Sequence, residues 1–203
     1  MKLKPVPLLS TVAVAAALSL AAPAAQAAII QYHADLSGPA ESPPNSSPGT
    51  GIAVLIYDST AHTLDIHAEW SGLVLTGTGT TVAHIHCCTP APFTGAVGVA
   101  VTPGTLPGFP VGTRSGTYDI LDLDLTTAAT FTAAFVTGFA GGVLADAEET
   151  LIAAFDSHRA YFNIHSSTFP SGEIRGFIIP EPATVALLGL GLLGLGAWRR
   201  KVD

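Results

Sequence analysis

The stretch GIAVLIYDSTAHTLDIHAEW, residues 51–70, decides the fold class. Residues 51–58 form a short apolar run, and residues 62–70 alternate between apolar and polar side chains, which is typical of strands separated by a turn. Stretches of the same kind recur at 30–36, 81–86, 117–125, 131–139, 160–166 and 173–179. About eight strands between Gly, Pro, Ser and Asn breakers predict an all-β fold, an antiparallel β-sandwich.

One segment departs from the strand pattern. In LADAEETLIAAF, residues 144–155, apolar residues recur at helical spacing, and three carboxylates fall in the first turn, where they stabilise the helix dipole. We therefore expect one short helix beside the strands. The Pro- and Gly-rich segments 39–50 and 102–116 are expected to be loops, because they cannot continue a sheet.

The first 27 residues have the pattern of a removed secretory signal peptide. Two lysines precede an apolar run, and Ala25-Gln26-Ala27 supplies the small-x-small sequence of a signal-peptidase site. We divide the chain into a signal peptide, a β-sandwich domain and a C-terminal sorting or anchor segment, at 1–27, 28–179 and 180–203.

The C-terminal segment has three parts in order. Pro180-Glu181-Pro182 is followed by the uncharged stretch ATVALLGLGLLGLGAW, expected to be a hydrophobic helix, and by the basic cluster 199–201. This order resembles the PEP-CTERM sorting signal of Gram-negative bacteria. The resemblance implies that an exosortase-type protease cuts near Pro-Glu-Pro. The exported chain would be anchored in the inner membrane before processing, and would then reach the cell surface or the exterior. A plain tail anchor is the alternative.

The charge of the domain argues against one class of partner. Residues 28–180 contain three arginines and thirteen carboxylates, which gives a net charge of −10 with the histidines neutral. A nucleic-acid binder needs a basic face to neutralise phosphates, so we expect no nucleic-acid partner.

Histidines and cysteines are concentrated in TVAHIHCCTP, residues 81–90. In a strand, residues two apart share a face, so His84 and His86 are expected to point to one side and the apolar residues between and before them to the other. Farther along, the segments 160–166 and 173–179 predict a hairpin with a polar stripe. The stripe consists of Asn163, His165, Glu173 and Arg175. We expect Arg175 to pair with Glu173 or another carboxylate.

These residues carry a second resemblance. AHIH at 83–86, YFNIH at 161–165 and GEIRG at 172–176 resemble the CHRD domain, and LSGPAESPPNSSPGTG at 36–51 is similar to its opening segment. The resemblance implies an immunoglobulin-like or superoxide-dismutase-like fold and a poorly defined molecular function. The motif positions besides the histidines are Asn163, Gly172, Glu173, Arg175 and Gly176. The chain departs from the family pattern at CCTPAP, 87–92, which replaces a Gly-Pro-Ala-like continuation.

Two interpretations of the histidines stay open. His84 and His86 could converge on one metal ion, and His165 from another strand would complete a three-histidine set of the kind that holds zinc or copper. Alternatively, the three side chains form hydrogen bonds, for instance to Asn163 or Glu173, within a polar seam.

The adjacent cysteines Cys87 and Cys88 also allow several states. Two cysteines in an exported chain normally imply a disulfide, but adjacent Cα atoms are about 3.8 Å apart, below the usual range for a bridge. A strained vicinal disulfide, an intermolecular disulfide, free thiols and thiolate ligation beside His86 are the alternatives.

Two functional hypotheses follow. The first is a non-catalytic surface or extracellular-matrix module, sorted by an exosortase-type system, that binds or assembles with an extracellular polysaccharide or protein. The second is a metal-binding or superoxide-dismutase-like metalloenzyme that uses the three histidines. A dinuclear copper and zinc site would need about six histidines, and His33 is the one plausible addition. We prefer the module and expect no enzymatic activity.

Overall fold

A computed structural model describes residues 29–74 and 76–181 of the chain. The predicted signal peptide, Pro182 and the predicted hydrophobic helix of the C-terminal segment lie outside the described residues. None of the helices in the described part is long and apolar enough to cross a membrane.

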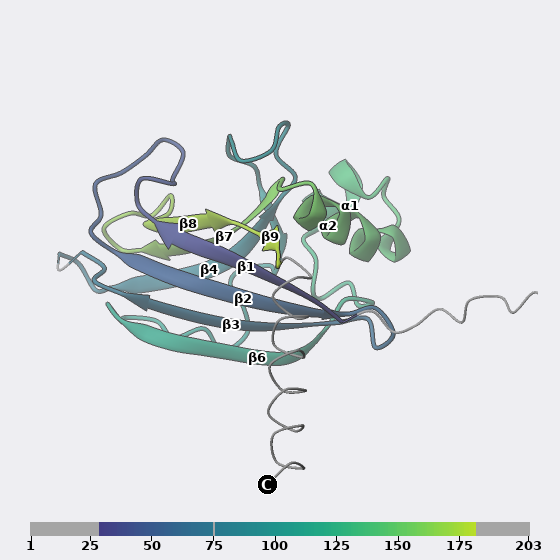
Figure 1. The fold of residues 1–203 in the computed structure, drawn as a ribbon, viewed down its shortest axis with the longest axis horizontal. Helices are drawn as coiled ribbons and strands as arrows, with labels where there is room; N and C mark the ends of the chain where they lie inside the picture. Colours follow the sequence, from purple (N-terminus) through teal and green to yellow (C-terminus); the bar gives the residue numbers. More distant parts are fainter. Residues whose placement is uncertain (1–28, 75, 182–203) are drawn as a thin grey trace, which may run out of the picture.

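Four long strands form one half of the sheet as an antiparallel array (Figure 1). They are β1 (Ile29–Ser37), β2 (Thr50–Asp58), β3 (Thr63–Ser71) and β6 (Gly116–Asp124). Buried and more accessible residues alternate along β1, β2 and β3, so one face packs on the core and the other faces outward. The alternation in residues 51–70 therefore correctly predicts the β2–β3 hairpin, whose register pairs Asp58 with Thr63.

Five shorter strands complete the sheet. They are β4 (Thr80–Cys87), β5 (Val99–Val101), β7 (Ala160–Ser166), β8 (Ile174–Phe177) and β9 (Ile179–Pro180). The order is β5-β4-β7-β8-β1-β2-β3-β6, with β9 also paired to β1. The predicted hairpin between the last two long segments is present as β7 and β8, which are antiparallel.

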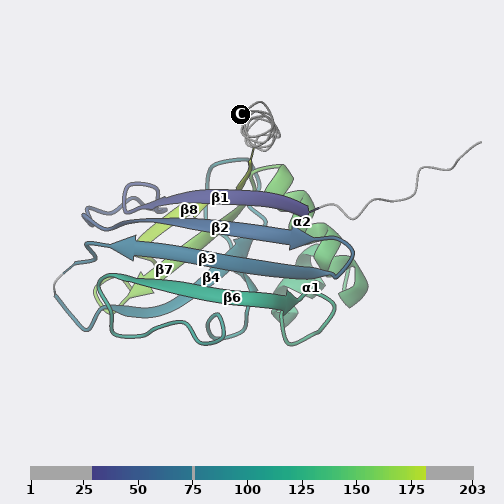
Figure 2. The same ribbon diagram turned by 60° about the horizontal axis from the view of Figure 1, so that its bottom comes forward.

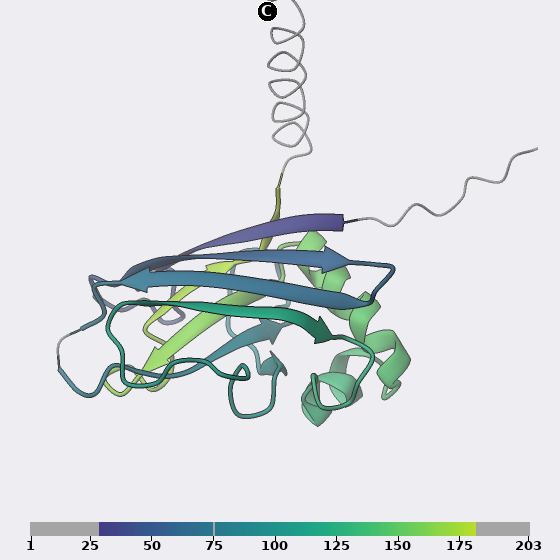
Figure 3. The same ribbon diagram turned by 90° about the horizontal axis from the view of Figure 1, so that it is seen from below.

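The strands belong to one curled sheet of nine strands rather than to the two separate sheets of a sandwich. Its halves face each other and enclose the core, with β4, β7 and β8 opposite β1, β2, β3 and β6 (Figure 3). The halves are joined where β8 meets β1, at the pair Ser37 and Arg175. Strand periodicity predicts two packed faces but carries no signal for this join, which explains why the sandwich prediction was only partly right.

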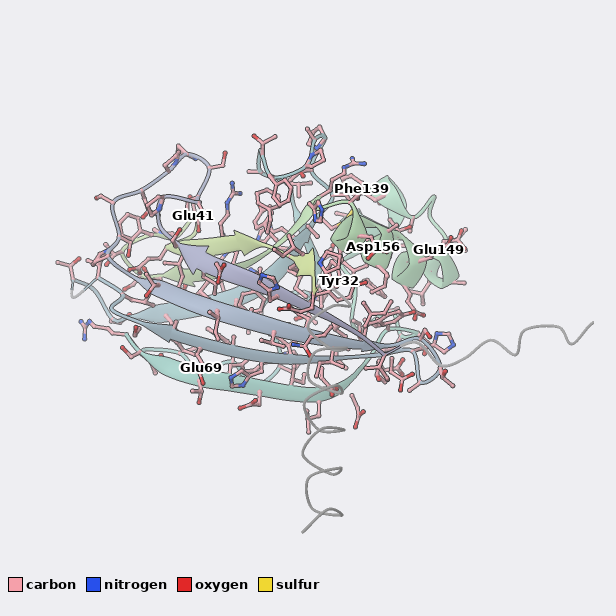
Figure 4. The ribbon with its side chains drawn as sticks, viewed as in Figure 1. Tyr32, Glu41, Glu69, Phe139, Glu149 and Asp156 are labelled. Carbon is pink, nitrogen blue, oxygen red and sulfur yellow. A yellow bond between two sulfur atoms is a disulfide. The ribbon has the colours of Figure 1, made fainter. Side chains whose placement is uncertain are left out.

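Two helices, not one, pack at one end of the curl (Figure 2). The predicted helix is present as α2 (Ala147–Asp156), preceded by a 3₁₀ turn, η1 (Leu144–Asp146). Its position is fixed by two buried tyrosines, since Tyr57 Oη donates to Glu148 and Tyr32 Oη donates to Asp156 (Figure 4).

The prediction of a strand at 131–139 was wrong, because this segment contains α1 (Ala133–Phe139). The Thr132 hydroxyl caps the helix by accepting from the Phe135 N–H at 3.2 Å. Phe131 and Phe135, four residues apart, are both buried and stack on each other. Their spacing fits one helix face as well as a strand, and the N-cap and the alanines after it favour the helix.

Candidate metal centre

The three candidate ligands come from neighbouring strands. His84 and His86 lie on β4, and His165 lies on β7, which pairs with β4 in antiparallel register. The alternation places Ala83 and Ile85 in the core, so the histidines occupy the opposite, outer face, as the sequence predicts. Each histidine is at most 9% exposed, because loops cover this face.

Each imidazole is oriented by one backbone carbonyl. His84 Nε2 lies 2.8 Å from the Gly104 oxygen and His86 Nδ1 lies 2.8 Å from the Val97 oxygen. His165 Nδ1 lies 2.9 Å from the Pro170 oxygen. A carbonyl oxygen only accepts, so these three ring nitrogens carry the hydrogen, and in a neutral imidazole the other nitrogen is left with a lone pair.

The three remaining nitrogens point toward one another. His84 Nδ1 and His165 Nε2 are 3.4 Å apart, and His86 Nε2 is buried without a hydrogen-bond partner. One ligand nitrogen from each ring lies within 4.8 Å of those from the other two. Ligands about 2.0–2.1 Å from a tetrahedral zinc ion are roughly 3.3 Å from each other. The first pair already has this spacing, and a small ring movement would bring the third nitrogen to the same ion.

Burial keeps these imidazoles neutral. Desolvation lowers the pKa of His84, His86 and His165, although the carbonyl contact of each ring opposes the shift. The effect is largest at His86, whose pKa falls to about 4. Neutral imidazole is the form that binds a metal ion, so the site is ready to accept one at neutral pH.

Aromatic and cationic side chains hold the covering loop in place. The Tyr161 ring stacks on the His86 ring, with centroids 4.7 Å apart. The Arg175 guanidinium also lies over the Tyr161 ring, 4.5 Å from its centre. Tyr161 Oη donates to the Val97 oxygen, the same carbonyl that orients His86, and Arg175 Nη1 donates to the Gly95 oxygen. The loop between β4 and β5 is therefore anchored at two points beside the site.

The predicted polar stripe is only partly present. Asn163 and Arg175 are cross-strand neighbours, but the carboxylate beside both is Glu41, from the loop between β1 and β2 (Figure 4). Glu173 accepts instead from the Ser47 hydroxyl and the Val74 N–H. The histidines contact backbone carbonyls and not Asn163 or Glu173.

Glu41 is the residue that the sequence analysis missed. It is buried, accepts from Asn163 Nδ2 at 2.9 Å and lies 3.8 Å from Arg175 Nε. Burial raises its pKa to about 7, against the opposing effects of Arg175 and Asn163. Its position within the opening segment 36–51 is the only sequence signal that could have pointed to it.

Gly172 and Gly176, the two glycines of the GEIRG motif, let neighbouring groups pack directly against the backbone. A Cβ on Gly172, which has φ of +128°, would meet the carboxylate of Glu41 and the amide of Asn163. A Cβ on Gly176 would meet the backbone of Asp35, where β8 meets β1. The GEIRG motif thus serves the join between the two halves of the sheet and the packing around Glu41.

The cysteines lie apart from the ligand atoms. Cys87 and Cys88 are bonded to each other and belong to the apolar core cluster. Cys88 also lines a cavity of about 360 Å³ with residues of α2 and Arg159, and none of the three histidines lines it. The sulfur atoms do not act as ligands beside His86 in this structure.

The other histidines are spread over the molecule. His33 Nδ1 lies 2.7 Å from Glu181, His62 contacts Glu148, and His67 contacts Glu69 and Asp119. His33 therefore does not extend the three-histidine cluster.

The described residues form a curled antiparallel β-domain that continues directly into the Pro-Glu-Pro segment. The CHRD domain matches residues 32–178, and the PEP-CTERM protein-sorting motif matches residues 179–201. The chain belongs to the CHRD domain family, and its motif marks it for export, processing by an exosortase and sorting to the cell surface. Neither a curated protein nor a solved structure matches it.

Proposed function

We propose that this exported CHRD domain is a non-catalytic surface or matrix module that binds one zinc or copper ion through His84, His86 and His165. The observation that carries the proposal is the arrangement of the imidazoles. Each gives one nitrogen to a backbone carbonyl, and the three remaining nitrogens converge in a buried site. Carbonyl contacts of this kind orient histidine ligands in metal proteins.

The surroundings favour a stabilising or assembly role over turnover. The three histidines are buried beneath loops, one of which Tyr161 and Arg175 anchor, and this cover restricts access by a substrate. The acidic domain would then act by binding an extracellular polysaccharide or protein, with the ion keeping β4, β7 and their loops in one arrangement.

A metalloenzyme with superoxide-dismutase-like chemistry is the second candidate. Three protein ligands leave the fourth position of a tetrahedral ion open, as in catalytic zinc sites. A dinuclear site has less support, because His33 contacts Glu181 and not the cluster. An assay of superoxide dismutation with the copper- and zinc-loaded protein separates the two candidates.

Metal analysis tests the proposal. The exported protein, purified from its host without a metal-binding tag, should carry or take up one equivalent of zinc or copper. Each of the variants His84→Ala, His86→Ala and His165→Ala should lose about 100-fold or more in affinity. The matched control His67→Ala removes an exposed histidine of another strand and should bind as the wild type does. A wild-type protein that takes up neither ion at neutral pH would contradict the proposal.

A further inference from the structure

The beginning of the sorting motif is part of the folded sheet. Strand β9 pairs with β1, with Ile179 opposite His33 and Pro180 opposite Tyr32. The Glu181 N–H donates to the Gln31 oxygen at 2.9 Å, and the Glu181 carboxylate lies 2.7 Å from His33 Nδ1. Both side chains of this last pair are 27% exposed. The first two residues of Pro-Glu-Pro are thus bound to the first strand of the domain.

No free linker separates this segment from the core. Ile178 is fully buried, and its N–H donates to the Ala160 oxygen at 3.0 Å. Strand β8 precedes it and lies between β7 and β1. Residues 174–181 are therefore continuously attached to the sheet, and the motif begins within its last strand, β9.

A protease that binds its substrate as an added strand needs the same backbone groups of residues 179–181 that pair with β1. Peptides commonly bind as added strands, through main-chain hydrogen bonds to the edge of a sheet. A segment within a folded sheet becomes accessible to cleavage through local opening, and the cleavage rate follows the population of the open form when opening is fast. A sorting motif that is paired with β1 is therefore accessible to a protease only while the strand is detached.

We propose that the CHRD domain masks its own sorting motif: β1, through Gln31 and His33, binds residues 179–181, and release of this strand limits processing by the exosortase. The proposal does not depend on the metal centre. Processing would be slow on a well-folded domain and faster when β9 detaches, so the fold of the domain controls when the chain leaves the membrane.

Pulse–chase labelling of the full chain in its exosortase-bearing host tests the proposal. His33→Ala removes the salt bridge to Glu181 without changing the motif. It should speed conversion of precursor to mature protein about two- to fivefold, the range expected for one lost, partly exposed ion pair. Tyr57→Phe is the matched control, because it removes a hydrogen bond to Glu148 on α2 and does not touch β9. An equal acceleration in both variants, or none in His33→Ala, would overturn the proposal.

A reversible disulfide between β9 and β1 should slow processing, the opposite of the effect expected for His33→Ala. His33 and Ile179 are direct cross-strand partners, so the double variant His33→Cys/Ile179→Cys can join β9 to β1 by a disulfide. The locked precursor should accumulate at least tenfold over the wild type, and reductant should release it to mature protein. The two single variants are the controls for mispairing with Cys87 or Cys88. Processing of the locked form at the wild-type rate, with the new disulfide verified by mass spectrometry, would rule out masking.

Discussion

Histidines on the two halves of the curled sheet have opposite surroundings. On β3, the His67 side chain is 40% exposed and contacts the carboxylates of Asp119 and Glu69, and these contacts, led by the hydrogen bond to Asp119, raise its pKa (Figure 4). On β4, His84 and His86 contact backbone carbonyls, and burial lowers their pKa.

The difference does not come from the strands, because His67 and His86 both lie on outer faces of the same sheet. It comes from the loops that cover β4 and β7, which supply the oxygens of Gly104, Val97 and Pro170. Carboxylates favour the imidazolium form, whereas a dry site with carbonyl oxygens favours the neutral form. The loops that cover a pair of histidines on a strand therefore decide whether their imidazoles are in the neutral form that a metal ion requires.

Removal of the proposed metal ion should have the largest effect on stability. At a free ion concentration a thousandfold above Kd, binding raises the free energy of unfolding by about 4 kcal/mol. Denaturant unfolding of the wild type with and without chelator should reveal this difference. His67→Ala should show the same difference and His86→Ala none. If chelator lowered the stability of all three proteins equally, the ion would not be held by the histidines of β4 and β7, and the contrast between the two halves of the sheet would be wrong.

Glu41 gives the next largest effect, through pH. Its pKa is about 7 in the folded domain and near 4.5 in the unfolded chain, so the folded state holds a proton that the unfolded state releases, and its stability contribution is lost as pH rises through this window. Relative to Glu41→Gln, the free energy of unfolding of the wild type should fall by about 3 kcal/mol between pH 4.5 and 7.5.

The difference between the two proteins is the quantity to measure, from unfolding curves at several pH values without added metal. The lowered pKa values of His84, His86 and His165 act in the opposite direction, since their contribution is lost as pH falls below about 6.5. A constant difference between wild type and Glu41→Gln would mean that the Glu41 carboxyl titrates normally.

The smallest effect is expected at His67. Its raised pKa means that its stability contribution is present below about pH 6.5 and is lost as pH rises through the folded-state pKa. Because the site is exposed and screened, His67→Ala should cost no more than about 1 kcal/mol at pH 5, and less at pH 9 or in high salt. A larger, salt-independent loss would show that this face is more buried in solution than the fold indicates.

Strand periodicity predicted the long strands, the antiparallel pairing and the face on which the histidines lie. It did not predict the join at Ser37 and Arg175, because one cross-strand pair between distant segments leaves no period in the sequence. The three-residue strand β5 was missed within a Gly-rich stretch. The oxygens that orient the histidines belong to backbone groups of loops, which no side-chain pattern marks.

The separation of the three proposed ligands along the chain has a consequence for where the proposed ion would be acquired. His84 and His165 are 81 residues apart, and β5, β6 and both helices lie between them. Bringing such distant positions together costs loop-closure entropy, so the unfolded chain rarely presents all three imidazoles to one ion. The proposed ion would enter only after β4 and β7 have paired, and from then on it would act as a cross-link across that long interval. For an exported chain that binds an ion in this way, the compartment in which it folds, rather than the one in which it is synthesised, would set which metal it carries.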